Sequence, residues 1–389
     1  MNTTTDTLPQ RLLLGSGPSP VPEQVLAALA LPTLGHLDPA FGEVMDEVGD
    51  LLRAAFVTEN RVAFPISGTG SAGMEAMVAN LVEPGERVVC GVHGLFGERM
   101  ADELARHGAE VVRVEAEWGR AIDPQALIDA VQADAAPAAL FVVHGETSTG
   151  VAQPLDGLAD AIHDRGGLLL IDCVTSLTGH PLRLDEAGVD AAFSGSQKCL
   201  NAPPGLAPLT VGPRALEKLA ARRTRVPSWY FDLNLILAYV DGEGGRTYHH
   251  TAPTNMIVAL REALRIAVQD EWLATRWERH RRAHEALRDA FEVLGMPRLA
   301  PADEALHPLL AVRVPDGIDE AAVRRTLLLE HDIEISGGLG PLAGKIWRIG
   351  VMGVGAQREP QEALITAVAA ELGQGADDAL AALQAGYAA

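Results

Sequence analysis

The feature that most constrains the fold is an alternation of short apolar runs with amphipathic segments between about residues 20 and 220. The apolar runs have the length of strands, and helical periodicity marks most of the segments between them. This alternation is typical of α/β proteins, in which helices cover a mainly parallel sheet. The predicted strands are 87–92, 110–115, 138–144, 168–172, 191–195 and 206–211, and the predicted helices between them include 97–107, 123–133 and 155–165.

The pattern changes at Thr254, where long helices begin and continue to Gly295, just before a proline. An α+β unit follows, which predicts a second and smaller domain. We therefore expect an N-terminal arm and large domain over 1–253 and a small domain over 254–389. The small domain is predicted to contain strands 309–314, 333–336 and 346–351, helices 320–330 and 361–372, and an alanine-rich surface helix over 376–389.

Composition excludes several function classes. The formal net charge of −21 disfavours binding to nucleic acids and anionic membranes, which select for clustered Lys and Arg. The three cysteines, Cys90, Cys173 and Cys199, show neither a disulfide framework nor zinc-ligand spacing. Because there is also no leader-like or membrane-length segment, we expect a cytoplasmic protein without membrane contact.

A glycine-rich loop follows the apolar run 62–66 and opens a predicted helix. Gly68, Gly70 and Gly73 match the G-x-G-x-x-G pattern of dinucleotide-binding loops. A dinucleotide site also needs an acidic residue about 20 positions later, whereas strand 87–92 ends in Cys-Gly-Val. The loop therefore predicts a phosphate site and argues against a dehydrogenase.

Two charged residues follow neighbouring predicted strands. Asp172 directly follows the continuous apolar run 168–171, and Lys198 lies in the small-residue loop after strand 191–195. Taken alone, Asp172 fits a helix cap or a buried ion pair, and Lys198 fits a surface lysine as well as a buried amine nucleophile. Together, an aspartate for a pyridinium nitrogen and a lysine for an imine are what a pyridoxal phosphate site requires.

With these residues the chain resembles the class V, fold-type I pyridoxal-phosphate aminotransferases, specifically the alanine–glyoxylate and serine–pyruvate group. The similarity extends over essentially the whole chain. The matching segments are LLGSGPSPVP, SGTGSAGMEA, GLFGER, HGETSTGVAQPLDG, LLLIDCVTSLTGHPL, SGSQKCLNAPPG, YHHTAPTNM and GKIWRIGVMG. The resemblance implies a mainly parallel seven-stranded sheet in the large domain.

The resemblance also implies roles for single residues. Lys198 would form the imine with pyridoxal 5'-phosphate, and Asp172 would pair with the ring nitrogen. Phe96 would stack on the pyridine ring, where relatives often have Trp, and Thr147 would contact the ring hydroxyl. The implied phosphate-binding residues are Thr69, Gly70, Ser71 and Gln197, with Ser71 contributing less than the histidine that some relatives have.

Further implied residues bind substrate or reach across a dimer. Arg348 matches the arginine that binds the substrate carboxylate, because a guanidinium can contact a carboxylate bidentately. Tyr248 and Thr251 match residues that reach the phosphate of the partner subunit, which implies a homodimer with shared active sites. By contrast, we expect His249 and His250 to be structural or interface residues. Cys173, Cys199 and Trp347 are expected to be buried packing residues.

The implied reaction moves an amino group from alanine or serine to glyoxylate, with amino acids and 2-oxo acids as small-molecule partners. A close alternative is (S)-ureidoglycine–glyoxylate aminotransferase, in which the position of His36 holds an amide residue, so His36 favours alanine. Cysteine desulfuration is disfavoured because no cysteine follows Cys199. A non-enzymatic sensor is disfavoured because Asp172, Lys198 and Arg348 are all present and no basic DNA-binding extension is evident.

Overall fold

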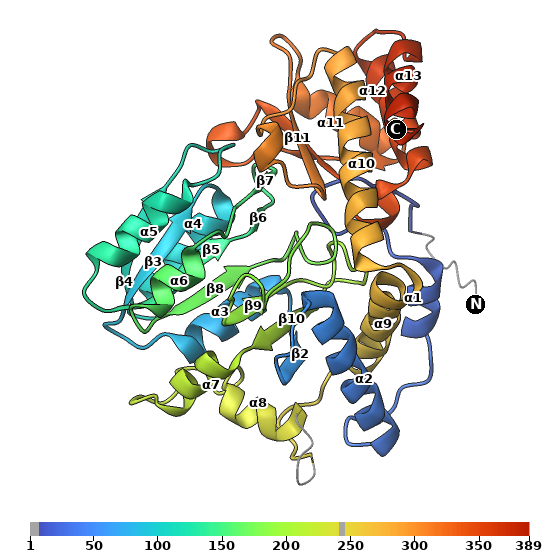
Figure 1. The fold of residues 1–389 in the computed structure, drawn as a ribbon. Coiled ribbons are helices and arrows are strands. Elements are labelled where there is room, and N and C mark those ends of the chain that lie inside the picture. Colours follow the sequence, from blue (N-terminus) through green and yellow to red (C-terminus); the bar gives the residue numbers. More distant parts are fainter. Residues whose placement is uncertain (1–7, 241–245, 389) are drawn as a thin grey trace.

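A seven-stranded sheet forms the centre of the larger part of the molecule in the computed structural model, which describes residues 8–240 and 246–388 (Figure 1). The strand order is β2-β10-β9-β8-β5-β3-β4, and β10 runs antiparallel to both of its neighbours. The observed sheet is thus mainly parallel, as expected. The strands are β2 Val62–Ser67, β3 Arg87–Val92, β4 Glu110–Glu115, β5 Pro137–Val143, β8 Leu168–Asp172, β9 Ala191–Phe193 and β10 Leu206–Val211.

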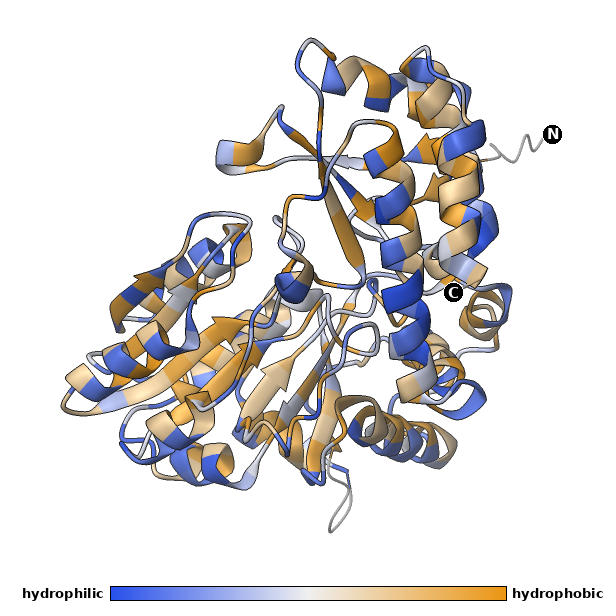
Figure 2. Ribbon diagram, turned by 45° about the horizontal axis from the view of Figure 1, so that its top comes forward, coloured by the Kyte–Doolittle hydropathy of each residue, from blue (hydrophilic) through white to orange (hydrophobic). Residues whose placement is uncertain are grey.

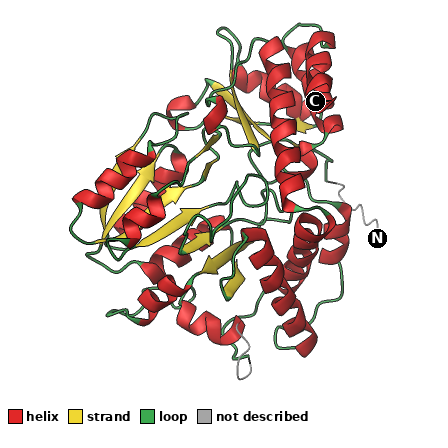
Figure 3. Ribbon diagram, in the orientation of Figure 1, coloured by secondary structure: helices red, strands yellow, loops and turns green. Residues whose placement is uncertain are grey.

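Helices cover both faces of this sheet, as Figure 3 shows. One face packs against α3 Gly70–Leu81, α4 Leu95–Arg106, α7 Pro213–Ala220 and α8 Leu233–Val240. The other packs against α1 Glu23–Leu29, α2 Pro39–Phe56, α5 Pro124–Ala133, α6 Leu158–His163 and α9 Thr254–Arg265. Successive strand residues point to opposite faces, so a strand covered on both sides is apolar throughout. The apolar colour of the strands in Figure 2 reflects this double burial.

The C-terminal part has its own core around a three-stranded sheet of order β11-β14-β13. Its longest helix, α10, packs along the C-terminal helix α13, whose inward face buries Ala379 and Leu383. The elements of this part are α10 Leu273–Val293, β11 Leu309–Arg313, α11 Glu320–Glu330, β12 Ile333–Glu334, β13 Ser336–Gly337, β14 Ile346–Gly350, α12 Arg358–Glu371 and α13 Asp377–Ala388.

The described residues also form several short elements. A two-stranded sheet joins β6 Gly145–Glu146 and β7 Val151–Ala152, and a π-helical turn, Ile266–Asp270, lies between α9 and α10. Three single 3₁₀ turns are Ala302–Glu304, Gly340–Leu342 and Gly353–Ala356. No helix in the described ranges is long and apolar enough to cross a membrane.

The N-terminal segment belongs to the C-terminal core in space. β1, Leu12–Leu13, pairs in parallel with β12, and Leu14 is fully buried among the side chains of that core. The residues that follow then enter the large sheet unit, so the chain between β1 and α1 bridges both parts. Sequence periodicity alone does not predict this pairing, because β1 is only two residues long.

The division at Thr254 stays a prediction, and the packing suggests a refinement. α9 begins at Thr254, but its buried residues Ile257, Leu260 and Leu264 belong to the core of the large sheet unit. α9 also packs against α1 and α2. We therefore propose that the functional boundary between the two parts lies in the π-helical turn that precedes α10.

The third glycine of the G-x-G-x-x-G loop packs α3 onto the sheet. A Cβ atom at Gly73 would lie 2.9 Å from the Cβ of Ala207 and 3.1 Å from the Cβ of Phe193. Both neighbours are sheet residues with no flexible side-chain end to displace, so helix and sheet could separate only by moving backbone. The glycine therefore has a packing role that the phosphate interpretation of the loop does not require.

We expect Gly73→Ala to lower the free energy of unfolding by about 1–3 kcal/mol, because overpacking strains a close helix–sheet contact. Denaturant unfolding followed by circular dichroism measures this effect. Gly35→Ala is the matched control, since a Cβ there meets no heavy atom within 4 Å. Equal losses of stability in the two variants would contradict the packing role of Gly73.

Candidate active site

A cavity of about 220 Å³ lies where the N-termini of α3 and α4 meet the carboxyl ends of the sheet strands. This edge of an open α/β sheet is the usual place for a ligand. The cavity brings together residues that are far apart in the sequence. Its lining includes the predicted residues Thr69, Gly70, Ser71, Phe96, Thr147, Asp172, Gln197 and Lys198.

Lys198 is buried in this cavity, with 8% of its surface exposed. Burial, followed by the nearby positive charge of Arg348, lowers the pKa of the amine to about 8. Its Nζ donates a hydrogen bond to the carbonyl oxygen of Ser16, in the N-terminal segment. Lys198 is therefore a desolvated amine rather than a surface lysine, which settles the alternative that spacing left open.

Gly17 lies against the same amine. A Cβ at this position would be 2.8 Å from the lysine Nζ, and its φ of +105° is strained for any residue with a side chain. The N-terminal segment therefore forms one wall around Lys198. The motif that contains Gly17 was part of the resemblance, but sequence reasoning assigned it no function.

Asp172 ends β8 and is 2% exposed. Burial raises the pKa of its carboxyl group to about 7. A hydrogen bond of 2.8 Å from the Val174 N–H to its Oδ1 opposes this shift, because it lowers the pKa. The negative charge of nearby Glu146 raises this pKa further, whereas Lys198 lowers it. A cationic group bound beside Asp172 would stabilise the ionised carboxylate, as the protonated ring nitrogen of pyridoxal phosphate would.

The N-terminus of α3 forms the phosphate end of the cavity. Thr69 precedes the helix, and its side chain makes no capping hydrogen bond. Gln197, which lines the same cavity, has a buried Oε1 atom without a hydrogen-bond partner in the described part of the chain. A helix N-terminus with uncapped N–H groups favours an anion. These features, with the buried Lys198 and Asp172, fit a pyridoxal phosphate molecule.

Glu146 and Thr147 connect the cavity to neighbouring elements. The Glu146 carboxylate accepts hydrogen bonds from the N–H groups of Phe96, at 3.1 Å, and Gly97, at 3.3 Å, so it caps α4. The hydroxyl of Thr147 is hydrogen-bonded to that of Thr175. Glu146 was not among the predicted site residues, although it lies beside Thr147 in a quoted motif, because a capping contact between distant segments leaves no sequence signal.

Arg348 lies on β14, next to the cavity rather than in its lining. Its Nε donates to the carbonyl of Gly337 at 2.8 Å, and its Nη1 donates to the carbonyl of Thr147 at 3.2 Å. The side chain is 6% exposed, and burial lowers its pKa to about 10. The C-terminal part thus brings a buried cation close enough to lower the pKa of Lys198, and the implied contact of Arg348 with a substrate carboxylate stays a prediction.

Tyr248 and Thr251 lie apart from this cavity and are exposed to solvent, Tyr248 by 57%. The Tyr248 ring lies 5.1 Å from that of His36. Neighbouring His249 stacks on Trp229 at 4.5 Å, and His250 is 2.7 Å from the hydroxyl of Ser67. The expected contact of Tyr248 and Thr251 with a partner's phosphate stays a prediction.

Arg99 also lines the cavity and was not predicted. It lies on α4, three residues after Phe96, and its Nη1 donates to the hydroxyl of Ser71 at 3.1 Å. Residues three apart share one face of a helix, so the arginine in the GLFGER motif could have been paired with Phe96 from the sequence. The sequence expectations named only the aromatic ring.

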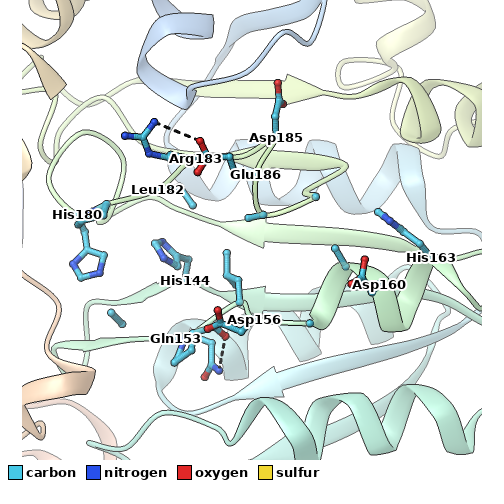
Figure 4. A pocket seen from close by; sticks show the side chains of 18 of the residues that line it. His144, Gln153, Asp156, Asp160, His163, His180, Leu182, Arg183, Asp185 and Glu186 are labelled. Atoms are coloured by element: carbon cyan, nitrogen blue, oxygen red, sulfur yellow. Dashed lines mark hydrogen bonds and ion pairs between the residues drawn. The ribbon is translucent and has the colours of Figure 1, made fainter. Parts of the chain in front are cut away.

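A second and larger cavity, of about 710 Å³, opens near α6 (Figure 4). Its apolar lining, which includes Leu155 and Leu182, packs with the α2 and α5 face of the sheet, away from α3 and α4. Among its polar groups, Arg183 and Glu186 are 3.6 Å apart, and Asp185 accepts a hydrogen bond at 2.6 Å from Thr58, which lies outside the lining. No group of metal-ligating side chains was found among the described residues. The larger cavity contains none of the predicted residues.

The predicted burial of Cys173, Cys199 and Trp347 is confirmed. Cys173 and Cys199 are free and buried, and burial raises the pKa of both thiols, that of Cys199 to about 12. Trp347 is fully buried in the small-domain core beside Arg348.

Comparison with known proteins decides the family. The family model for class-V aminotransferases matches residues 12–345. The chain belongs to the class-V aminotransferases. It is therefore an aminotransferase that depends on pyridoxal phosphate, and the arrangement of Lys198 and Asp172 described above fits that cofactor.

Three relatives show how far the similarity extends. A solved alanine–glyoxylate aminotransferase from Nostoc sp. is 46% identical, with a TM-score of 0.92 over 96% of this chain and 98% of that one. A solved ureidoglycine–glyoxylate aminotransferase from Bacillus subtilis is 37% identical, with a TM-score of 0.95 over 99% of this chain and 100% of that one. The alanine–glyoxylate aminotransferase of Callithrix jacchus is 40% identical over 90% of this chain and 85% of its own length.

The raised pKa of Asp172 gives a test that does not depend on turnover. Because the folded-state pKa of about 7 lies above the ordinary 3.8, the carboxyl group destabilises the cofactor-free fold increasingly as pH rises through this window. Asp172→Asn should therefore stabilise the cofactor-free protein by a few kcal/mol at pH 8, since each pKa unit corresponds to about 1.4 kcal/mol.

Denaturant unfolding of both proteins at pH 8 and pH 5 measures this difference, which should shrink at the lower pH. The same substitution should slow transamination by roughly two to four orders of magnitude, because the ring nitrogen loses its anionic partner. A variant no more stable than the parent at pH 8 would contradict the buried, uncompensated carboxylate.

Proposed function

We propose that the enzyme transfers the amino group of alanine, or of serine, to glyoxylate, giving pyruvate, or hydroxypyruvate, and glycine. The observation that carries the proposal is the enclosure of Lys198 and Asp172 in one cavity that ends at the N-terminus of α3. The similarity to alanine–glyoxylate aminotransferases from Nostoc and Callithrix supports the substrate pair.

Each residue of the cavity has a chemical role in this proposal. When bound, pyridoxal phosphate supplies an electron sink for the substrate α-carbon. Lys198, whose lowered pKa leaves much of the amine neutral near pH 8, takes the α-proton and returns it as a general acid. Asp172 holds a proton at the ring nitrogen, and Phe96 and Thr147 orient the ring.

Arg348 positions the substrate carboxylate. Two of its N–H groups already bind the carbonyls of Gly337 and Thr147, which fixes the plane of the guanidinium. The remaining donors can then contact a carboxylate, and the buried setting strengthens this contact. Amino acids and 2-oxo acids share this carboxylate, so one arginine would serve both half-reactions.

A homodimer would complete the phosphate site. Tyr248 and Thr251 are exposed on this chain and would reach the cofactor of a second copy. The same surface exposes Trp229 and Tyr230, by 63% and 39%, near the stacked His249. Clustered exposed aromatic side chains are typical of interfaces between proteins.

We also place the enzyme in the cytoplasm, since its cysteines are free.

Ureidoglycine is the second candidate donor, supported by the close match to the Bacillus subtilis structure. His36 is the residue that favours alanine. Because its ring contacts Tyr248, a homodimer would bring His36 near the partner's substrate rather than near its own Lys198. Alanine and serine differ by one hydroxyl, so few pocket contacts separate them.

The visible absorbance of the purified protein tests the donor. We expect a yellow protein whose absorbance bleaches on addition of alanine or serine and returns on addition of glyoxylate. Bleaching by ureidoglycine alone would assign the enzyme to the alternative reaction. A colourless protein that binds no pyridoxal phosphate would overturn the assignment of Lys198.

Substitution of Arg348 tests the carboxylate site. Arg348→Lys should raise the KM for both the amino donor and glyoxylate by roughly tenfold or more, because lysine cannot bind a carboxylate bidentately. Steady-state kinetics measure the effect, with Arg313→Lys on the exposed end of neighbouring β11 as the control. An unchanged KM for both substrates would place the carboxylate elsewhere.

A further inference from the structure

Arg99 is the cavity residue to which the proposed reaction gives no role. It lies in the second turn of α4 and lines the same cavity as Lys198. Its Nη1 donates to the hydroxyl of Ser71, and its guanidinium carbon lies 5.0 Å from the centroid of the Phe96 ring. These contacts hold the cation between the ring end and the phosphate end of the cavity.

Arg99 has no ion-pair partner among the described residues. The acid one turn later on α4, Glu103, has a buried Oε2 atom that no hydrogen-bond donor of the described residues contacts. Other arginines nearby are paired: Arg106 binds Asp102 at 2.7 Å, and Arg113 binds Glu98 at 2.7 Å. Arg99 thus keeps free N–H donors at the cavity in which an anion is expected.

The phosphate needs a cation that the expected contacts do not supply. A phosphate monoester carries nearly two negative charges at neutral pH, whereas a helix N-terminus offers about half a positive charge. The expected phosphate contacts in this chain, Thr69, Gly70, Ser71 and Gln197, are all neutral. Lys198 and Arg99 are the only cationic side chains that line the cavity within the described ranges, and Lys198 is used by the imine.

We propose that Arg99 binds the phosphate of the cofactor, together with the hydroxyl of Ser71. Because Arg99 donates to the Ser71 oxygen, the serine hydrogen is free to point at a phosphate oxygen. The remaining guanidinium N–H groups supply charge-assisted hydrogen bonds. This inference rests on the proposed position of the phosphate at the N-terminus of α3.

The alternative role of Arg99 is structural. Burial raises the pKa of the Glu103 carboxyl to about 7, and the positive charge of Arg99 lies close enough to lower it in part. If Arg99 only compensates Glu103, removing either charge would loosen α4, whatever ligand is bound. A ligand with and without the phosphate separates this possibility from the proposal.

The test compares equilibrium binding of pyridoxal phosphate and of pyridoxal, which lacks the phosphate, to the cofactor-free protein by absorbance. The proteins are the parent, Arg99→Gln, Arg99→Lys and Arg106→Gln. Arg106 is the matched control, since it lies on α4, is exposed and is paired with Asp102 away from the cavity lining. Circular dichroism and thermal unfolding establish that each variant is folded.

We expect Arg99→Gln to weaken binding of pyridoxal phosphate by roughly tenfold or more and to leave pyridoxal binding nearly unchanged. Arg99→Lys should show a smaller loss, because it keeps the charge without the planar group, and Arg106→Gln should bind both like the parent. The ³¹P resonance of the bound phosphate should also titrate at higher pH in Arg99→Gln, as its dianion loses a cation.

Equal weakening of pyridoxal phosphate and pyridoxal, or no weakening of either, would overturn the proposal. So would a Glu103→Gln variant that reproduces the loss seen in Arg99→Gln, since that result assigns the effect to helix α4. If Arg99→Gln is unfolded, Arg99→Lys decides the question, through its loss of pyridoxal phosphate binding relative to its loss of pyridoxal binding. Failure of the proposed function is distinguishable, because the parent protein itself would then bind no pyridoxal phosphate through Lys198.

Discussion

Desolvation of two opposite charges at one edge of the sheet is the constraint on which the rest of this site depends. Lys198 and Asp172 are both nearly excluded from solvent. Burial lowers the pKa of Lys198 and raises that of Asp172, so it favours the neutral form of each group. Neither pKa shift stabilises the cofactor-free protein, because burying an ionisable group costs free energy. In the proposed function, a ligand with an aldehyde for the amine and a nitrogen for the carboxylate would use both groups at once.

The surrounding fold keeps this arrangement rigid. Asp172 is the end of a strand that lies between β5 and β9, so its position is set by ladders on both sides. Lys198 follows β9, and its amine is held by the Ser16 carbonyl in a segment that pairs with the small domain. The large sheet and the C-terminal core therefore both determine where the amine lies.

Local sequence patterns predicted most of the regular elements. β3, β4, β8 and β10 have the predicted bounds. Short apolar runs mark β3, β8 and β10, and alternation of valines with charged residues marks β4, and both are local patterns. α12 begins at Arg358, three residues before its predicted start, since Pro360 is tolerated in the first turn of a helix. α6 is shorter than predicted because Gly157, in a left-handed conformation, precedes it. The predicted strand 333–336 is divided between two sheets, β12 beside β1 and β13 beside β14, a choice that depends on distant partners.

The sequence by itself determined the fold class, through strand periodicity, and the family, through a series of matching motifs, because both are properties of local stretches of residues. It also singled out Lys198 and Asp172, whose chemical roles stay a prediction. Only the tertiary structure decided that Lys198 is desolvated, that Gly17 walls it in, and that Glu146 caps α4 beside the cavity. It also decided that Arg99 lines the cavity without an ion-pair partner in the described part of the chain. Burial and charge pairing arise from segments that meet only on folding, and so the pKa of a group, unlike its identity, cannot be read from its neighbours in sequence.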